Sequence, residues 1–205
     1  MLASSFLVWL YRLDSSVFRW INHLSGHVRV IDEFFKGFAN DYFALITACL
    51  VLVWLWFGTR DPAQREKNQK TVFYAMISMG IVSAFMSIIN HFYYRVRPFD
   101  QLPPGTVHLV YYRPVDSSFP SNLAAVLFAI AAPVFFRNRK YGYWLLGLAV
   151  LVSFGRVYMG VHFPLDVVGG AVLGVLNAIL CMGIGWCFRW LMNILLIIFR
   201  FFTIA

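Results

Sequence analysis

The sequence predicts an all-α polytopic membrane protein, a helical bundle of five to six transmembrane helices that forms a single domain over residues 1–205. The mean hydropathy is +0.70, and charged residues make up 13% of the chain. Soluble domains carry about 25% charged residues, so this chain has too few to cover a water-facing surface. Its apolar residues also gather in runs near the ~20 residues that a spanning helix needs.

Five long apolar runs account for the predicted bundle, although two of them are somewhat short for a span. They cover residues 42–58, 71–92, 120–136, 142–158 and 164–188. The apolar tail, 190–205, is expected to be an interfacial helix or the end of the last span.

The N-terminal region, 1–41, has a different pattern. Arg12, Asp14 and Arg19 interrupt an otherwise aromatic and aliphatic stretch over 3–24. Three charges at the depth of the bilayer would be costly. We therefore expect a helix that lies in the membrane interface rather than one that spans the membrane.

The charge of the connections predicts an orientation. Basic residues crowd the connections 58–70 and 137–140, and cytoplasmic loops carry such an excess. Two predicted spans separate these connections, so both can lie on the cytoplasmic side. The segments 92–119 and 157–164 then share the opposite face. This places the protein in the plasma or inner membrane with that face toward the exterior or periplasm.

Nucleic acid, metal and cofactor binding are not expected. The net charge is +8, but the basic residues form short clusters between apolar runs rather than an extended basic surface. Cys49, Cys181 and Cys187 lie in apolar stretches without the spacing of metal ligands. The expected partners are membrane lipids.

The first of three unusual groups on the outer face is "NHFYYRVRPFD", residues 90–100. Pro98 should end a helix that begins near residue 71, leaving Arg97 at the membrane edge. An arginine offers paired donors that suit a phosphate group. The alternative is that Arg95 and Arg97 extend to the interface to keep their charges in water.

The second group is "SSFPSNLAA", residues 117–125. Proline is favoured in the first turn of a helix, so Pro120 marks a helix start. Ser121, Asn122 and Leu123 would then lie in the first turn, where free backbone N–H groups can bind an anion. The alternative is an ordinary helix start with a polar cap.

The third group is "GRVYMGVHFPLDVVGG", residues 155–170. Asp166 lies four residues after His162, close enough through one helical turn to accept the ring N–H. That bond would fix the tautomer and leave the other ring nitrogen as a nucleophile or base. Arg156 precedes His162 by six residues. The alternative is a structural hydrogen bond between the histidine and the aspartate.

Together the three groups resemble the motifs of the type 2 phosphatidic acid phosphatase (PAP2) superfamily of membrane phosphatases: K-x6-RP, PSGH and SR-x5-H-x3-D. The similarity covers a motif-bearing core over residues 71–185. The pieces "RPF", "SFPS" and "RVYMGVHFPLDVVGG" are most similar to the short bacterial branch that acts on undecaprenyl diphosphate.

The resemblance implies a phosphatase that transfers the phosphoryl group in two steps without a metal ion or other cofactor. His162 would attack phosphorus to form a phosphohistidine, and Asp166 would orient and stabilise it. Arg97, Arg156 and Ser121 would bind the phosphate oxygens, together with the N–H groups of residues 122 and 123.

The implied substrate is undecaprenyl diphosphate in the outer leaflet, as part of cell-wall lipid recycling. The alternative substrates are phosphatidylglycerol phosphate, phosphatidic acid and lipid A phosphates. The alternative class of protein is a binder or transporter of lipid phosphates that catalyses nothing.

Four positions depart from the family motifs, of which Asn122 at the glycine place is compatible with a helix start. Leu123 stands where the family has the histidine that protonates the leaving group, and leucine cannot donate a proton. Asn90 stands where the family has lysine, and Gly155 replaces a serine. Three interpretations of Leu123 stay open: a deliberate inactivating substitution, a natural protein that binds without turnover, or another proton donor such as His108.

Overall fold

The structure is a computed structural model that describes residues 2–201, and in this range it contains helices and loops but no strand. The helices, in chain order, are α1 Leu2–Asn22, α2 Arg29–Phe38, α3 Phe43–Phe57, α4 Pro62–Phe92, α5 Pro98–Gln101, α6 Asn122–Arg137, α7 Arg139–Tyr158, α8 Pro164–Cys187 and α9 Arg189–Phe201. Of the predicted tail, residues 202–205 lie outside the described residues.

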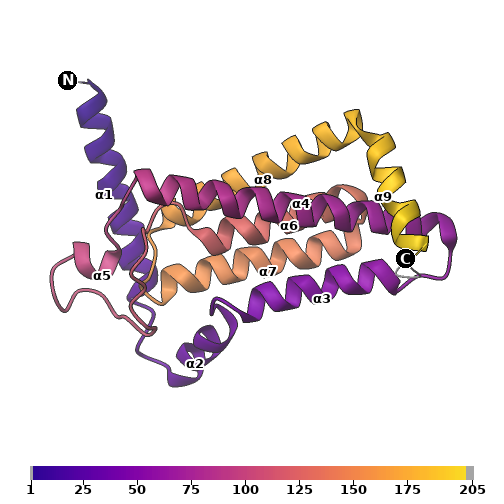
Figure 1. The fold of residues 1–205 in the computed structure, drawn as a ribbon. Coiled ribbons are helices and arrows are strands. Elements are labelled where there is room, and N and C mark those ends of the chain that lie inside the picture. Colours follow the sequence, from indigo (N-terminus) through magenta and orange to yellow (C-terminus); the bar gives the residue numbers. More distant parts are fainter. Residues whose placement is uncertain (1, 202–205) are drawn as a thin grey trace.

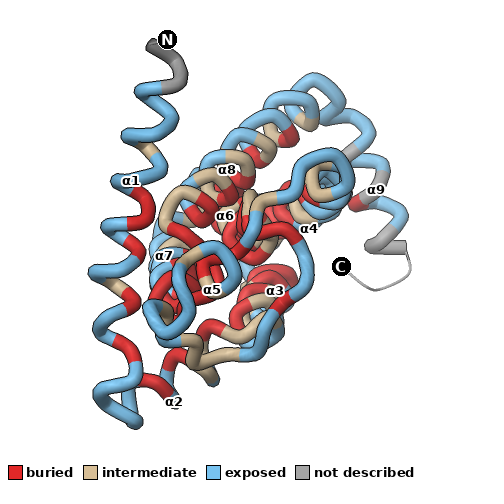
Figure 2. The backbone as a smooth tube through the Cα atoms, turned by 90° about the vertical axis from the view of Figure 1, so that its left-hand side faces the viewer, coloured by how far each residue is buried: buried red, intermediate tan, exposed pale blue. Residues whose placement is uncertain are grey.

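Helix α6 occupies the centre of the bundle, with α3, α4, α7 and α8 around it (Figures 1 and 2). Ten of its sixteen residues are buried, and most of them are alanine or branched aliphatic residues. Two glycines of α8 allow a close approach to α6. A Cβ atom at Gly170 would stand 2.4 Å from the carbonyl oxygen of Ser121, and one at Gly174 would stand 2.3 Å from that of Ala125. Small residues at a crossing let two helix backbones pack closely.

The helix ends follow local sequence signals, with two differences from the predicted positions. Helix α4 begins at Pro62 rather than near residue 71, because Asp61 caps it by accepting a hydrogen bond from the Gln64 N–H at 3.0 Å. Helix α6 begins at Asn122, so Ser121 is the N-cap and lies outside the first turn. Helix α8 begins at Pro164, as predicted.

Each of the five apolar runs forms a helix, but fewer of these helices reach the length of a full span. Within the described part of the chain, α4 and α8 are long and apolar enough to cross a membrane. The α2–α3 pair, bent by 52°, would make a third if it counts as one broken span. Helix α6 is apolar but has 16 residues, or about 24 Å at 1.5 Å per residue. The number of spans therefore stays a prediction.

Helix α1 stands across one end of the bundle rather than along it (Figure 1). It is not among the helices long and apolar enough to span. Arg12 and Arg19 are exposed, whereas Asp14 is buried against the other helices. The end of α4, the start of α6 and the α7–α8 junction all lie near this end of the bundle, so the three motif groups meet beside α1.

Candidate active site

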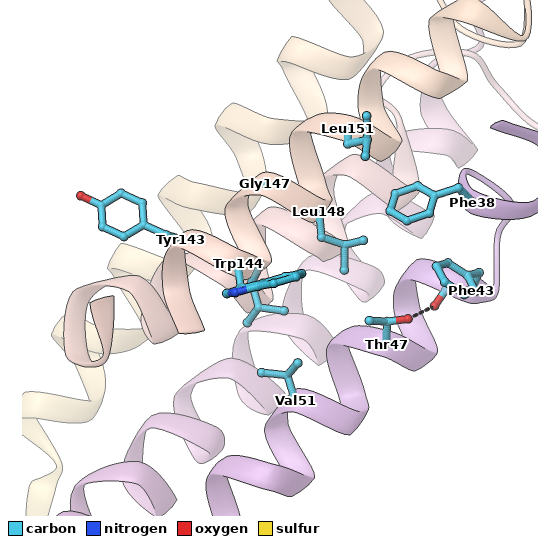
Figure 3. A pocket seen from close by; sticks show the side chains of 10 residues that line it. Phe38, Phe43, Thr47, Val51, Tyr143, Trp144, Gly147, Leu148 and Leu151 are labelled. Carbon is cyan, nitrogen blue, oxygen red and sulfur yellow. Dashed lines mark hydrogen bonds between the residues drawn. The ribbon is translucent and has the colours of Figure 1, made fainter. Parts of the chain in front are cut away.

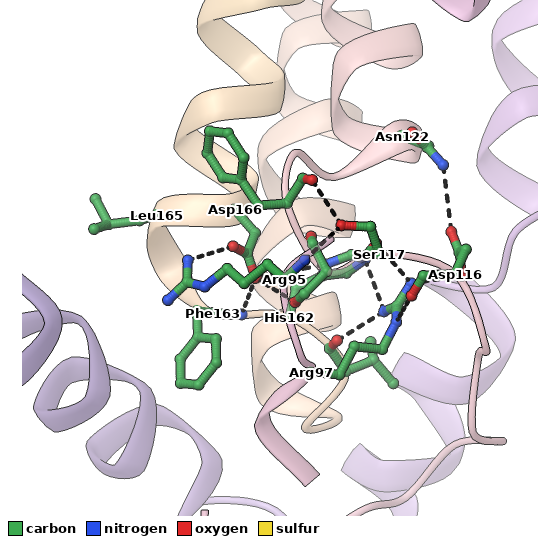
Figure 4. Close-up of polar contacts among 12 residues, drawn as sticks. Arg95, Arg97, Asp116, Ser117, Asn122, His162, Phe163, Leu165 and Asp166 are labelled. Carbon is green, nitrogen blue, oxygen red and sulfur yellow. Dashed lines mark hydrogen bonds and ion pairs between the residues drawn. The ribbon is translucent and has the colours of Figure 1, made fainter. Parts of the chain in front are cut away.

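A small polar pocket of about 160 Å³ lies where the three motif groups meet. Its lining combines motif residues with residues from two loops: Asp41, Arg97, Tyr112, Pro114, Asp116, Asn122, Leu123, Arg156 and His162. Figure 4 shows the polar contacts around His162 on the side facing α8.

The imidazole of His162 is held in one tautomer. Its Nδ1 lies 2.9 Å from the carbonyl oxygen of Ser118, and a carbonyl can only accept a hydrogen bond. Nδ1 therefore carries the proton, and Nε2 carries the lone pair. Nε2 lies 3.3 Å from Nη1 of Arg97. The nitrogen that can act as a nucleophile thus faces the arginine expected to bind phosphate.

The environment of His162 keeps the ring neutral. Burial lowers the pKa of His162 to about 4, and the positive charges of Arg156 and Arg97 act in the same direction, against the opposing effect of Asp166. The loop that carries His162 lies between α7 and α8. Because the pKa is lowered, the ring stays in its neutral form at pH values well above 4.

Asp166 does not contact His162 as the sequence predicted. Its Oδ2 lies 3.8 Å from Nδ1 of His162, beyond hydrogen-bond distance. That oxygen instead accepts from the hydroxyl of Ser118 at 2.5 Å and from the N–H of Phe163 at 2.8 Å. The carbonyl of Ser118 accepts the hydrogen bond from Nδ1–H of His162, so Asp166 acts on His162 through Ser118.

Arg97 is buried, and its guanidinium donates to several groups around the pocket. Nε and Nη2 contact the backbone oxygen and the carboxylate of Asp116 at 3.0 and 2.8 Å. Nη1 contacts the carbonyl of Val161 at 2.8 Å, besides Nε2 of His162. Arg97 is therefore fixed by protein contacts. The alternative, in which its side chain extends to the interface and keeps its charge in water, does not hold for this residue.

Arg156 is paired with a carboxylate from the N-terminal region. Its Nη1 lies 2.9 Å from Oδ1 of Asp41, whose Oδ2 accepts from the hydroxyl of Tyr112 at 2.5 Å. Gly155 makes this pairing possible, because a Cβ there would stand 2.7 Å from the Cβ of Ala39. The glycine that replaces the family serine thus lets the end of α2 approach α7.

Two buried donors at the site have no partner in the described structure: Oγ of Ser121 and Nε of Arg156. A buried polar group without a protein partner is costly unless a bound ligand pairs with it. Both side chains belong to the predicted phosphate-binding set.

The remaining motif positions also come together. Nδ2 of Asn90 lies 3.2 Å from Oδ1 of Asn122, whose own amide lies 3.3 Å from Oδ2 of Asp116. Leu123 lines the pocket and packs in the hydrophobic core, so no proton donor stands at its position.

His108 does not lie at the pocket, contrary to its suggested role as a substitute proton donor. Its Nδ1 contacts the carbonyl of Ser25 at 2.8 Å, and its ring lies beside those of His23 and His27. Tyr112 is the hydroxyl donor that lines the pocket. Burial and the hydrogen bond to Asp41 raise the pKa of Tyr112 to about 12, so this hydroxyl stays protonated at neutral pH.

Sequence reasoning did not place Asp14, Asp41, Ser118 or Tyr112 at the site. One signal pointed to Asp14: an acidic residue in an apolar stretch is expensive unless it is paired. Asp41 and Tyr112 lie in loops without a distinguishing pattern, and Ser118 lies in the second motif group but had no predicted role.

An apolar groove of about 610 Å³ lies between α3 and α7 (Figure 3). Its walls are formed by Phe38, Phe43, Thr47, Val51, Tyr143, Trp144, Leu145, Gly147, Leu148 and Leu151. Phe38 and Phe43 stand on either side of Asp41 in the chain, so one end of the groove lies near the polar pocket. Among residues 2–201, no group of three or more His, Cys, Asp and Glu side chains is arranged to hold a metal ion.

Comparisons with known proteins identify similar sequences and a similar fold. Among curated proteins, the chain is 31% identical over 167 residues to the bacitracin transport permease protein BcrC of Bacillus licheniformis. The aligned region covers 82% of this chain and 78% of that protein. It is 32% identical over 166 residues to undecaprenyl-diphosphatase BcrC of Bacillus subtilis, with 80% of each chain covered.

Among solved structures, the fold is similar to the crystal structure of LpxE from Aquifex aeolicus. The TM-score is 0.64 and the sequence identity 26%, over 82% of this chain and 93% of that chain. The predicted all-helical membrane fold is thereby confirmed. The sequence profile of the PAP2 superfamily matches residues 71–190, more than half of the chain. The three motif groups, their meeting at one pocket and these similarities lead to one conclusion: the chain belongs to the PAP2 superfamily.

Proposed function

We propose that this chain is a lipid phosphatase that converts undecaprenyl diphosphate to undecaprenyl phosphate through a phosphohistidine at His162. The observation that carries the proposal is the fixed tautomer of His162, whose free Nε2 lies 3.3 Å from Arg97 at the wall of a polar pocket. The relative named undecaprenyl-diphosphatase supports the choice of substrate.

In the first step, Nε2 attacks the terminal phosphorus and the bond from phosphorus to the bridging oxygen breaks. The leaving group departs as a lipid phosphate, which keeps the electron pair of that bond. The Nδ1 proton stays on the ring, where the carbonyl of Ser118 and the nearby charge of Asp166 stabilise the cationic phosphoimidazole. In the second step, water attacks phosphorus and the bond from phosphorus to Nε2 breaks, with its electron pair returning to Nε2. Both protons of the water leave on inorganic phosphate, and the ring is again neutral.

Binding requires an exchange of partners at both arginines. Arg97 and Arg156 would turn from Asp116 and Asp41 to the oxygens of the substrate phosphate. The hydroxyl of Ser121 and the N–H groups of Asn122 and Leu123 would bind further oxygens at the start of α6. These groups attract charge that develops on the transferring phosphoryl group.

The lipid tail is expected to follow the groove between α3 and α7, because its walls are apolar and one end lies near Asp41. The pocket would face the periplasm or exterior of the inner or plasma membrane, because the basic connections 58–70 and 137–140 lie at the opposite end of the bundle.

A second candidate function is binding or transport of a lipid phosphate without hydrolysis. Leu123 favours this second function, because the leucine at the place of the family's proton donor cannot donate a proton to the leaving group. The printed name of the relative from Bacillus licheniformis, a transport permease, points the same way. Both functions would use the same pocket.

The test is phosphate release by the purified chain from undecaprenyl diphosphate, with phosphatidylglycerol phosphate, phosphatidic acid and a lipid A phosphate as competing substrates. We expect release to be fastest from the lipid diphosphate and to disappear in His162→Ala, with an acid-labile, base-stable phosphoenzyme in the unmodified chain. His91→Ala is the matched control, since His91 is exposed at the end of α4. Tight binding without any release would favour the second function, and an active His162→Ala variant would exclude the mechanism.

A further inference from the structure

Asp14 on α1 lies outside the three motifs and outside the residues that the PAP2 profile matches, and its carboxylate is buried beside the active site. Oδ2 accepts a hydrogen bond from Nη2 of Arg95 at 2.7 Å, and Oδ1 accepts one from the N–H of Leu165 at 2.9 Å. Leu165 belongs to the first turn of α8. Asp14 therefore places a negative charge at the N-terminus of the helix that carries Asp166, where the helix dipole favours it.

Arg95 connects Asp14 to Asp166. Its Nη1 lies 2.5 Å from Oδ1 of Asp166, and its guanidinium lies over the ring of Phe163 at 4.4 Å. The donors of a guanidinium lie in one rigid plane, so an arginine bound at both nitrogens fixes the positions of the two carboxylates. Arg95 also fixes the neighbouring loop, because its backbone carbonyl accepts from the N–H of Ser118 at 2.9 Å.

Ser118 completes the connection to the ring. Its hydroxyl donates a hydrogen bond to Asp166, and its carbonyl accepts one from Nδ1–H of His162. The chain of contacts thus runs from Asp14 through Arg95, Asp166 and Ser118 to His162. Arg95 is shared by two carboxylates, so Asp14, Arg95 and Asp166 together have a net charge of −1. This charge lies near the His162 ring, which becomes cationic in the proposed first step.

We infer that Asp14 and Arg95 are positioning residues for His162, which makes α1 a functional part of the active site. The inference rests on the proposed role of His162 as nucleophile. Neither residue lines the pocket, so both act through Asp166 and Ser118 and not on the substrate. With a neutral side chain at position 14, Arg95 loses one of its two charged partners. Its guanidinium is then held less firmly, and so are Asp166 and Ser118, whose positions favour the Nδ1–H tautomer.

The test compares Asp14→Asn with Asp32→Asn in the full chain. Asp32 is a matched control: it is a buried N-terminal carboxylate that accepts from Gly26 N–H and Tyr158 hydroxyl and has no contact with His162. We expect Asp14→Asn to lower kcat on lipid diphosphate by about 10- to 100-fold with little change in KM, as misplacement of a reacting group does. Asp32→Asn should keep the kcat of the unmodified chain, even where it lowers thermal stability equally.

Two further variants separate positioning from a general loss of structure. In Asp14→Asn/Asp166→Asn the loss should equal that of Asp166→Asn alone, because Asp14 acts through Asp166. Arg95→Lys keeps the charge but lacks the planar fork, so it should lower kcat in the same way. If Asp14→Asn does not fold, Arg95→Lys takes its place in the comparison with Asp32→Asn. A kcat for Asp14→Asn or Arg95→Lys no lower than that of Asp32→Asn overturns the inference.

A readout without turnover separates this inference from the proposed function. The chain has five histidines, so ¹⁵N resonances of its rings can be assigned with His162→Ala and used to identify each tautomer. We expect His162 to hold its proton at Nδ1 in the unmodified chain and in Asp32→Asn, and to become a mixture of tautomers in Asp14→Asn. An unchanged tautomer in Asp14→Asn contradicts the inference, whatever the hydrolysis assay shows. Hydrolysis that survives His162→Ala contradicts the proposed function instead.

Discussion

At the scale of single residues, Leu123 bears on which substrates the proposed site would turn over. It lines the pocket at the start of α6, where the leaving group would stand after attack by His162. A phosphate monoester must expel an alkoxide, whose conjugate acid is very weak. A lipid diphosphate expels a phosphate with a second pKa of about 6, which barely needs a proton near neutral pH. A pocket with leucine at this position therefore suits a diphosphate better than a monoester.

Leu123→His should raise hydrolysis of a lipid monophosphate more than hydrolysis of a lipid diphosphate of the same chain length. A positioned general acid contributes about 10²–10⁴-fold to a step that needs one, and the diphosphate should gain less. Initial rates on the two substrates measure the effect, with thermal unfolding as a check because the histidine is introduced among core residues. Equal rates before and after the change would show that position 123 is not the acid's place and would direct attention to Tyr112.

At the scale of elements, α3 and α7 form the groove proposed for the lipid tail (Figure 3). The tail leaves one apolar environment, the bilayer, for another, so the groove gains packing contacts rather than a hydrophobic transfer. Its effect on affinity should therefore be moderate and should grow with tail length.

Gly147→Trp should weaken binding of a long-chain diphosphate but not of a five-carbon isoprenyl diphosphate. A Cβ at Gly147 meets no atom within 4 Å, so the indole would project into the groove without disturbing the helices. The loss of ten carbon contacts at about 0.1 kcal/mol each is about 1 kcal/mol, or roughly fivefold in KM. Gly80→Trp on α4 is the control, because Gly80 is equally unobstructed and lies away from the groove. The same rise in KM for both variants would contradict the proposal that the lipid tail binds in this groove.

At the scale of the whole molecule, the two ends of the bundle differ in charge and function. The pocket lies at the end beside α1, and the basic connections 58–70 and 137–140 lie at the other (Figure 1). An orientation with the basic end in the cytoplasm gives the pocket access to the outer leaflet.

Cysteine labelling should distinguish the two ends. The three native cysteines would be replaced by alanine, and single cysteines placed at Lys67, Arg139 and Gln101, all of them exposed. A membrane-impermeant maleimide should label position 101 on intact cells, and positions 67 and 139 after the cells are opened. External labelling at 67 would reverse the orientation and with it the outer-leaflet substrate.

The sequence by itself determined the class of fold and the motif residues. Low charge and apolar runs are properties along the chain, and they sufficed to predict a helical membrane protein. The spacing of His162, Arg156 and the prolines at helix starts sufficed to gather the motif groups at one end. The starts of α4 and α6 differ from the predicted positions, because the side chain of Asp61 caps α4 ahead of the apolar run and Ser121 lies at the N-cap of α6 rather than in its first turn.

Only the tertiary structure decided which groups hold these residues in place. Asp14 and Asp166 meet on one guanidinium although 152 positions of the chain separate them, and Asp41 reaches Arg156 across 115 positions. Periodicity predicted a direct hydrogen bond between His162 and Asp166. The backbone carbonyl of residue 118 lies nearer to Nδ1 of the ring and accepts that hydrogen bond instead. Which groups form a hydrogen bond depends on differences of a few tenths of an ångström in donor–acceptor distance. Between separate elements, these distances are set by how α1, α6, α7 and α8 pack together.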